Sequence, residues 1–463
     1  MQNSASQERS ALFVATLTSF MGPFMISSVN VALPVIQKEL GMNAVQLGWV
    51  ATAYLLGTAM FLVPAGKVAD IYGRKKVFTS GLVCYTLACG LAAFVHSAGW
   101  LIALRFFQGV GAALFVTTGM AIVTSIFPPQ RRGRAIGIYV SAVYIGLSVG
   151  PFVGGLMTQH LGWRSLFMIM LLVGAAPIVA VRFLKGEWAD AAGERLDVLG
   201  SVMYAGAIFA LVYGATLMPA GKAYVIVAVG CAGIVAFVWR QKHTTQPVFD
   251  VSLFQTNHTF AFSSIAALIH YAATFAVTFL ISLFVQYIKG LTPQSAGLVL
   301  VAQPVLMAML SPIAGRLSDR IEPRLIASAG MAVTALCLAG FALLTPATPL
   351  ALIICNLALL GFGFAMFSSP NMSAIMGAVE KRHYGIASGA VATMRLIGQM
   401  MSMAAATVVL SIYLGTESIH PATYPLFLKS TKTLFIFFAL LSSMGVYFSL
   451  FRGKIRGATH ENY

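Results

Sequence analysis

Fourteen apolar stretches, each long enough to cross a lipid bilayer, follow one another along this chain of 463 residues. A helix needs about 20 mostly apolar residues to span the hydrocarbon. Only 9% of the residues are charged, against about 25% in soluble proteins, which excludes a soluble enzyme and a disordered chain. We predict an all-α membrane protein with spans at residues 11–36, 46–66, 77–96, 99–126, 134–159, 165–184, 198–218, 223–239, 259–288, 294–314, 325–344, 350–376, 385–414 and 433–451.

The loops between these spans carry an uneven distribution of basic residues. With the N-terminus in the cytoplasm, 21 of the 29 Lys and Arg residues fall in inner loops and 6 in outer loops. Because basic loops stay on the cytoplasmic side, we expect both termini to be cytoplasmic in a multi-pass protein of the cell inner membrane. The net charge of +16 lies in short clusters that suit an anionic leaflet, so we exclude a nucleic-acid partner.

Several short segments recur along the chain at a constant offset of 252 residues. The matched pairs are Gly109-Val-Gly111 with Gly361-Phe-Gly363, Ala135-Ile-Gly137 with Ala387-Ser-Gly389, and Ile145-Gly146 with Ile397-Gly398. A looser match joins Asp70 to Asp319. We therefore predict two pseudo-symmetric six-helix bundles, residues 1–184 and 259–463, with two linking helices and short loops in residues 185–258. Parallel halves of this kind form transporters that hold substrate near mid-membrane.

The turn between the second and third spans carries a charged cluster. Asp70 lies at the cytoplasmic end of the second span, Gly73 suits a tight turn, and Arg74 follows it. An acid in this position can bond basic groups or the positive N-terminus of a nearby helix. We expect a latch that closes the cytoplasmic side and opens during transport, with candidate partners Arg131, Arg132 and Arg134. The alternative is a solvated turn that only obeys the positive-inside rule.

Two arginines lie within the predicted spans. Arg105 lies about six residues into the fourth span, three positions before Gln108, and Arg395 lies in the thirteenth. Placing an arginine in hydrocarbon costs at least about 2.5–3.5 kcal/mol, so each is expected to face a cavity or a polar partner. The alternatives are that Arg105 snorkels to the outer interface and that Arg395 only bonds polar groups within the bundle.

The fifth span carries glycines at a spacing of four. Gly146, Gly150 and Gly154 share one helix face and permit close contact with a neighbouring helix. Pro151 frees a backbone carbonyl and bends the helix. The alternative is that these glycines serve only helix packing, which would require the same pattern of small residues.

These segments resemble signatures of the major facilitator superfamily, in its fourteen-helix drug:proton antiporter branch of multidrug efflux type. Residues 66–76 resemble the loop signature, Arg105 to Gly109 the Arg-x-x-Gln-Gly signature, and Gly150 to Gly155 the Gly-Pro-x-x-Gly-Gly antiporter signature. Residues 29–34 look like the branch's Val-Asn-Val-Ala-Leu-Pro. The resemblance implies secondary transport by alternating access, with Pro151 and its glycines as a seal or hinge and with no covalent chemistry.

One position departs from that branch. The slot in the first span that usually carries an aspartate holds Met25, and by our spans none of the 13 Asp and Glu residues lies in the hydrocarbon. Polar or basic residues remain midway, and the candidates for substrate or coupling are Arg105, Gln108, His270, Arg395, Asn30, Gln303 and Asn371. A positive interior favours anionic, zwitterionic or neutral amphipathic substrates over cations.

His270 is the first candidate for a coupled proton, because histidine changes charge near neutral pH. The alternative is a neutral histidine bonded to a helix neighbour. We predict an exporter of small amphipathic compounds, monomeric and without cofactor or metal, with lipid as its surroundings and protons as the expected coupling ion. The alternative function is an uncoupled facilitator or importer of organic anions. A membrane enzyme or receptor would need clustered His, Asp or Glu or a sensory domain, and a channel would lack the repeat.

Overall fold

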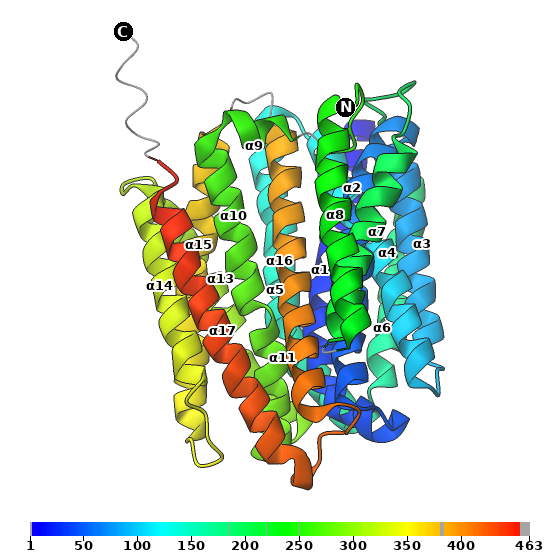
Figure 1. The fold of residues 1–463 in the computed structure, drawn as a ribbon. Helices are drawn as coiled ribbons and strands as arrows, with labels where there is room; N and C mark the ends of the chain where they lie inside the picture. Colours follow the sequence, from blue (N-terminus) through cyan, green and yellow to red (C-terminus); the bar gives the residue numbers. More distant parts are fainter. Residues whose placement is uncertain (1, 185, 219, 250, 380–383, 454–463) are drawn as a thin grey trace. The chain divides into compact units, whose positions relative to one another are not determined.

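The structure, a computed structural model, describes residues 2–184, 186–218, 220–249, 251–379 and 384–453 (Figure 1). Within these ranges all regular structure is helical. The chain divides into two compact units. The first comprises Met1–Phe249 with Leu291–Leu298, and the second comprises Asp250–Gly290 with Val299–Tyr463.

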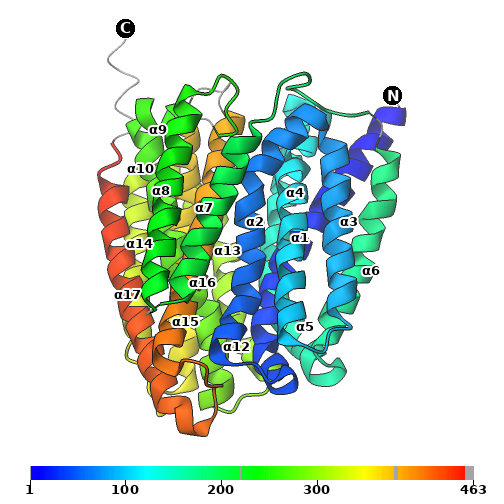
Figure 2. The same ribbon diagram turned by 45° about the vertical axis from the view of Figure 1, so that its right-hand side comes forward.

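The first unit contains eight long helices among its described residues. They are α1 (Gln2–Leu40), α2 (Ala44–Tyr72), α3 (Arg74–Ala92), α4 (Ala98–Ile126), α5 (Pro129–Leu161), α6 (Arg164–Ala180, followed by η1, Val181–Phe183), α7 (Val198–Thr216) and α8 (Gly221–His243). Helix α1 packs on α5, α4 packs on both α2 and α3, and α3 also packs on α6. The pair α7 and α8 packs together and contacts α2, as Figure 2 shows, so these two helices belong to this unit.

The second unit repeats much of this plan. Its helices are α9 (Ser252–Thr256), α10 (His258–Thr274), α11 (Ala276–Leu283), η2 (Phe284–Ile288), α13 (Ala302–Ser318), α14 (Pro323–Phe341), α15 (Leu350–Gly377), α16 (Tyr384–Leu414), η4 (Pro421–Thr423) and α17 (Tyr424–Leu450). Helix α15 packs on α13 and α14, α10 packs on α16 and α17, and α14 packs on α17. Helix α12 (Pro293–Leu300) begins among residues of the first unit and ends in the second.

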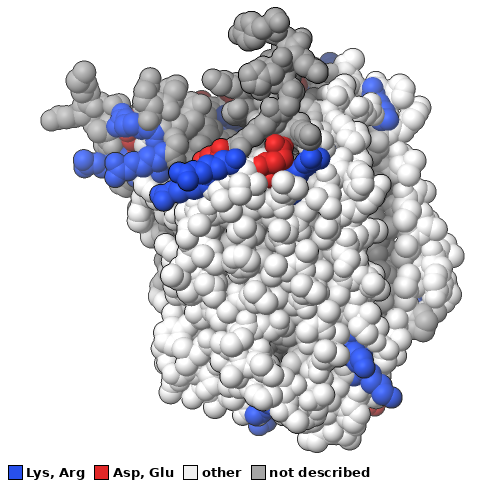
Figure 3. Space-filling model, turned by 90° about the vertical axis from the view of Figure 1, so that its left-hand side faces the viewer, with Lys and Arg blue, Asp and Glu red and all other residues white. Residues whose placement is uncertain are grey.

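Thirteen helical segments of the described chain are long and apolar enough to cross a membrane. The remaining predicted span is α3, which begins with Arg74, Lys75 and Lys76 and is thereby less apolar. With 19 residues it is as long as α7 and α14, which do qualify. The all-α membrane class is confirmed, and thirteen segments plus α3 agree with the expected fourteen. The face drawn in Figure 3 shows an uncharged band between charged ends.

Short polar segments set the helix boundaries. Asn43 accepts a hydrogen bond from the Gln46 backbone while the Gln46 side chain accepts one from the Asn43 backbone, a capping box that starts α2. Gly41, at φ +63°, follows the end of α1, and Gly73, at φ +112°, joins α2 directly to α3. Only glycine adopts such angles readily. The tight turn predicted at Gly73 is therefore confirmed.

The glycines that defined the sequence repeat make equivalent contacts in the two units. A β-carbon on Gly109 of α4 would lie 2.1 Å from the carbonyl oxygen of Tyr54 on α2. A β-carbon on Gly361 of α15 would lie 2.3 Å from the carbonyl oxygen of Gln303 on α13. Each glycine therefore lets two helix backbones touch, and the two contacts correspond across the offset.

The other matched pairs follow the same rule. A β-carbon on Gly111 would meet the carbonyl oxygen of Gly81, and one on its match Gly363 would meet that of Gly330. Likewise, a β-carbon on Gly146 would meet the carbonyl oxygen of Phe20, and one on its match Gly398 would meet that of Leu268. Gly137 and Gly389 both face open space. The four contacts and the two open positions therefore fall into matching pairs across the offset of 252 residues. The predicted repeat is thus confirmed as a repeat of helix packing.

Candidate functional site

The end of α2 carries the predicted acid in a charged cluster. Oδ1 of Asp70 accepts hydrogen bonds from Nε and Nη2 of Arg74, at 3.0 and 2.8 Å. The positive φ of Gly73 starts α3 immediately after the turn, which brings Arg74 back beside Asp70. Nη2 of Arg74 also donates to Asp190 at 2.6 Å. One guanidinium therefore bridges two carboxylates.

Residues 186–197, here called the acidic loop, supply the remaining counter-charges of this turn. Glu194 pairs with Lys67 at 2.5 Å, and Glu187 accepts a hydrogen bond from the backbone of Lys75 at 2.7 Å. The backbone N–H of Ala191 donates to the carbonyl oxygen of Asp70 at 2.9 Å. The loop between α6 and α7 therefore lies directly on the α2–α3 turn, and the acidic composition of the loop is the only sequence signal for this contact.

Asp70 pairs with Arg74 and not with Arg131, one of its three predicted partners. Arg131 donates instead to Glu8 of α1, at 2.9 Å. The side chain of Arg132 lies outside the described residues, and Arg134 is exposed. The turn at Gly73 explains this pairing, because it brings the guanidinium of Arg74 next to Asp70, where Asp190 of the acidic loop also holds it.

Asp319 follows α13 at its C-terminal cap, before Pro323 starts α14. It thus lies at the junction that corresponds to the α2–α3 turn of the first unit. The gating role of Asp70 and Asp319 stays a prediction.

The glycine face of α5 packs on α1. A β-carbon on Gly150 would lie 1.9 Å from Oγ of Ser27, and one on Gly154 would lie 2.6 Å from Cα of Ser28. Oγ of Ser28 donates to the carbonyl oxygen of Gly150 at 2.9 Å. The stripe is therefore filled by two serines of α1, and any added side chain would separate the helices.

The other face of the same segment of α5 meets α12. A β-carbon on Gly297 would lie 2.1 Å from the carbonyl oxygen of Pro151, and one on Gly155 would lie 2.4 Å from that of Pro293. Gln294 also lies 3.4 Å from Nε2 of His160. The antiporter-like signature thus joins α5 closely to two helices, and its role as a seal or hinge stays a prediction.

Arg105 is buried inside the first unit, with 1% of its surface exposed. Its Nε donates to the carbonyl oxygen of Val50 at 3.1 Å, and Nη1 donates to the side chain of Gln108. The guanidinium lies 4.7 Å from the ring centre of Tyr54, and Gln108 donates to Sγ of Cys89 at 2.9 Å. Arg105 does not snorkel, and it joins α2, α3 and α4 through polar partners.

His270 of α10 is enclosed by aromatic rings in the second unit. The ring centres of Phe367 and Phe364 lie 4.1 and 4.8 Å from that of His270, and Tyr271 lies at 6.0 Å. The side chain is fully buried, and neither ring nitrogen has a hydrogen-bond partner among the described residues. The hydrogen bond to a helix neighbour, which was the alternative for His270, is therefore not formed among the described residues.

The remaining polar candidates differ in exposure. Arg395 of α16 and Gln303 of α13 are partly exposed, whereas Asn30 of α1 is 3% exposed. Among the residues that the structure describes, Arg395 has neither an ion pair nor a hydrogen bond to its side chain. Arg395 and Gln303 are therefore the predicted candidates with side-chain surface still accessible.

Asn371 belongs to a structural contact that the sequence analysis missed. Its Nδ2 donates to the carbonyl oxygen of Ser263 at 3.1 Å, and its Oδ1 accepts from Nη1 of Arg452 at 2.5 Å. Arg452 follows α17 and is fully buried. Burial lowers the pKa of Arg452 to about 10, with Glu322 opposing and Arg324 adding to the shift. Asn371 thus holds the end of α17 against α10 and α15.

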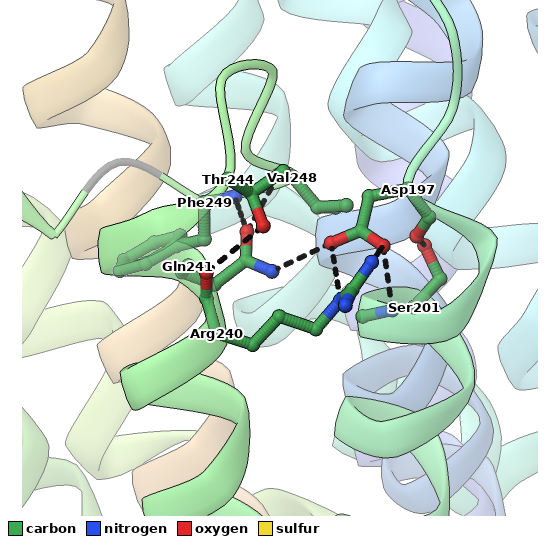
Figure 4. A network of polar contacts seen from close by, with 8 residues as sticks. Asp197, Ser201, Arg240, Gln241, Thr244, Val248 and Phe249 are labelled. Carbon is green, nitrogen blue, oxygen red and sulfur yellow. Dashed lines mark hydrogen bonds and ion pairs between the residues drawn. The ribbon is translucent and has the colours of Figure 1, made fainter.

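A second network fixes the linking helices (Figure 4). Asp197 caps α7 by accepting from the backbone of Gly200 at 2.9 Å, and it accepts from Nη2 of Arg240 on α8 at 2.7 Å. Gln241 donates to Asp197 at 3.0 Å and accepts from the backbone of Val248 at 2.7 Å. Burial acts to raise the pKa of Asp197, but the hydrogen bonds from Arg240, Gly200 and Gln241 outweigh it and lower that pKa.

The described carboxylates all lie in loops or in the first or last two turns of a helix. In the same part of the chain, no three or more His, Cys, Asp or Glu side chains are grouped to hold a metal ion. The fold and these sites define a multi-pass helical membrane protein built from two repeated bundles.

The family model of the Major Facilitator Superfamily matches residues 12–403, and the chain belongs to this superfamily of transporters. The riboflavin transporter RibZ of Clostridioides difficile is 31% identical over 388 residues, which cover 83% of this chain and 84% of RibZ. The multidrug resistance protein Stp of Mycobacterium tuberculosis is 32% identical over 409 residues, covering 85% and 75%. The protein is thus a carrier and not an enzyme.

Among solved structures, a bacterial homolog of the human lysosomal transporter Spinster, in an inward-facing and unoccupied conformation, has a TM-score of 0.69. The two sequences are 14% identical, and the match covers 96% of this chain and 97% of the other. This likeness shows the fold.

Proposed function

We propose that this protein exports small amphipathic compounds by alternating access of two six-helix lobes, residues 1–184 and 259–463. The protein would lie in the inner membrane of the cell, with both termini in the cytoplasm. The relative named as a multidrug resistance protein supports the export of varied compounds. The helices α7 and α8 would move with the first lobe, because they pack on α2.

The observation that carries the proposed substrate class is the position of the carboxylates. None of those described lies further into a helix than its first or last two turns, whereas Arg105 and Arg395 do. Fixed positive charge without a nearby acid repels lipophilic cations and attracts anions. The proposed substrates are therefore neutral, zwitterionic or anionic amphiphiles.

We assign direct substrate contact to Arg395 and Gln303, because their side chains are partly exposed. Arg105 instead contributes charge and positions helices, since protein groups already occupy its Nε and Nη1. Asn30 and Gln108 are also buried, and Gln108 links Arg105 to Cys89 of α3. Coupling to protons would pass through His270, whose aromatic neighbours can stabilise a cation by their ring faces.

The test is transport by purified protein in proteoliposomes with an anionic, a neutral and a cationic amphiphile of similar size. The variant Arg395→Gln should reduce transport of the anion at least about tenfold, the value of one lost charge-assisted hydrogen bond, and leave the neutral compound within about threefold. The matched control is Arg182→Gln, an exposed arginine of η1. Efficient transport of the cation by the unaltered protein would contradict the proposed substrate class.

Proton coupling is tested in the same vesicles. An imposed pH gradient should drive export in the unaltered protein and lose its effect in His270→Gln. Transport that ignores the gradient while His270 is intact supports the alternative, an uncoupled facilitator or importer. The neutral compound of choice is riboflavin, because the similar protein RibZ is named as a riboflavin transporter and riboflavin carries no charge at neutral pH.

A further inference from the structure

A cavity of about 460 Å³ opens in the first unit where α1 and α5 begin and α4 ends. Its lining combines charged and apolar side chains. The residues are Glu8, Arg9, Leu12, Phe127, Arg131, Arg134, Ala135 and Ile138. It lies at an end of the helices, away from the polar residues placed within the spans.

The charged part of the lining has an excess of positive groups, with three guanidinium groups and one carboxylate. The carboxylate of Glu8 is engaged by Arg131 at 2.9 Å. Arg9 and Arg134 are exposed, and neither has an ion-pair or hydrogen-bond partner among the described residues. Two guanidinium groups therefore remain available to a ligand in the cavity.

The start of α5 adds to this positive potential. The first turn of α5 contains no acidic residue, and Pro128 at its cap offers no side-chain acceptor. The N–H groups at a helix start carry partial positive charge that favours anions. The cavity is thus electropositive from two independent sources.

The apolar part of the lining is anchored in the core of the unit. Phe127 and Ala135 belong to a buried cluster with Ala15, Val123 and Tyr139, against which Leu12 packs. Because this wall is fixed, an alkyl or aromatic group could contact it without a rearrangement. The same cavity therefore offers a charged rim for an anionic group and an apolar wall for a tail.

We propose that this cavity binds an anionic amphiphile, with its phosphate or carboxylate between Arg9 and Arg134 and its tail on Leu12, Phe127 and Ile138. Two sources share this chemistry, an anionic phospholipid of the facing leaflet and a free anionic amphiphile. The site does not depend on the identity of the transported compound, and its test needs no transport.

The first arm measures binding of octyl phosphate and inorganic phosphate to the whole protein by calorimetry in a non-ionic detergent. Octyl phosphate should bind, and inorganic phosphate should bind more weakly, by about threefold to fourfold per methylene in contact with the wall. The double variant Arg9→Gln with Arg134→Gln should weaken octyl phosphate binding at least about tenfold. The double variant to Lys keeps the charge and should retain most of the affinity.

A substitution of Glu8 should change the affinity for octyl phosphate in the opposite direction, towards tighter binding. Glu8→Gln removes the acid that engages Arg131, so it should strengthen binding of octyl phosphate several-fold. A variant that merely disturbs the fold would not do this. Arg182→Gln, at an exposed arginine outside the cavity, should leave the affinity unchanged.

The second arm distinguishes the source by native mass spectrometry of the protein with phosphatidylglycerol or phosphatidylcholine. Retention of phosphatidylglycerol that the double Gln variant loses identifies a lipid site. Binding of octyl phosphate without such retention identifies a site for free amphiphiles. Equal retention of both lipids, or octyl phosphate affinity that is the same in the double Gln variant and the Arg182→Gln control, would overturn the proposal.

Discussion

Buried charged side chains of this protein take different kinds of partner. Arg105 uses a carbonyl oxygen, an amide and an aromatic ring. Asp197 uses a full ion pair with Arg240, and Arg452 uses the amide of Asn371. A buried charge without partners costs several kcal/mol, so each of these contacts restricts which helices can lie beside one another. None of the three requires a carboxylate in the middle of the membrane.

The Asp197 network yields a prediction about pH. Asp197→Asn keeps an N-cap acceptor for Gly200 but removes the charge paired with Arg240. We expect a loss of about 1–3 kcal/mol at pH 7, seen as a lower unfolding temperature in detergent. Because the folded pKa of Asp197 is lowered, this contribution is present above the ordinary carboxyl pKa of about 3.9 and is lost as the pH falls through the lower folded value.

The unaltered protein should therefore lose stability on acidification to about pH 3, and the Asn variant should lose less over the same range. Glu417→Gln, at an exposed acid, is the control. Parallel curves for the Asn variant and the unaltered protein would contradict the assignment.

Residues of the candidate site were partly predictable. The signature at residues 66–76 identified Asp70, but its partner depends on the backbone angle at Gly73 and on a loop more than 100 residues away. Asn371 was predicted as a mid-membrane polar residue because hydropathy gives depth only coarsely. Arg452 resembled an ordinary basic residue after the last span, and only tertiary packing reveals its burial.

At the scale of helices, small residues decide which faces meet. The matched glycines of α4 and α15 touch backbone carbonyls of α2 and α13, so the offset of 252 residues reports a spatial correspondence. This part of the fold was predictable, because close backbone contact needs glycine and leaves a sequence trace. The contact of α5 with α12 left no such paired trace, since Gly155 and Gly297 belong to no repeat.

The repeat predicts that replacing equivalent glycines in the two units lowers the stability of the protein by similar amounts. Gly109→Ala and Gly361→Ala each place a methyl group within 2.3 Å of a backbone oxygen, and each should cost about 1–3 kcal/mol through helix displacement. Gly137→Ala and Gly389→Ala meet open space and serve as controls. Thermal unfolding in detergent of the four variants measures this. Stability of Gly109→Ala equal to that of Gly137→Ala would show that the helices are not in close contact there.

At the scale of the molecule, the acidic loop connects the charge cluster to the linking helices. It binds the α2–α3 turn at Lys67, Arg74 and Lys75, and it leads directly into Asp197 at the start of α7. The acidic loop therefore fastens the start of α7 to the predicted latch at the α2–α3 turn. The sequence repeat could not predict this link, because the acidic loop lies in residues 185–258, outside the two repeated bundles.

The link is tested by neutralising the loop with Glu187→Gln, Asp190→Asn and Glu194→Gln together. Lys67 and Arg74 are mostly covered, with 16% and 14% of their side chains exposed. Loss of the loop contacts should expose them, so trypsin should cleave the α2–α3 turn several-fold faster in the triple variant. In about 1 M salt, where charges are screened beyond about 3 Å, the unaltered protein should approach the variant, whose cleavage should barely respond to salt. Cleavage after Lys242 is the internal reference, because it lies outside the loop. Equal cleavage of the turn in both proteins at low salt would mean that the loop does not hold it, and the coupling of α7 to the latch would then fail.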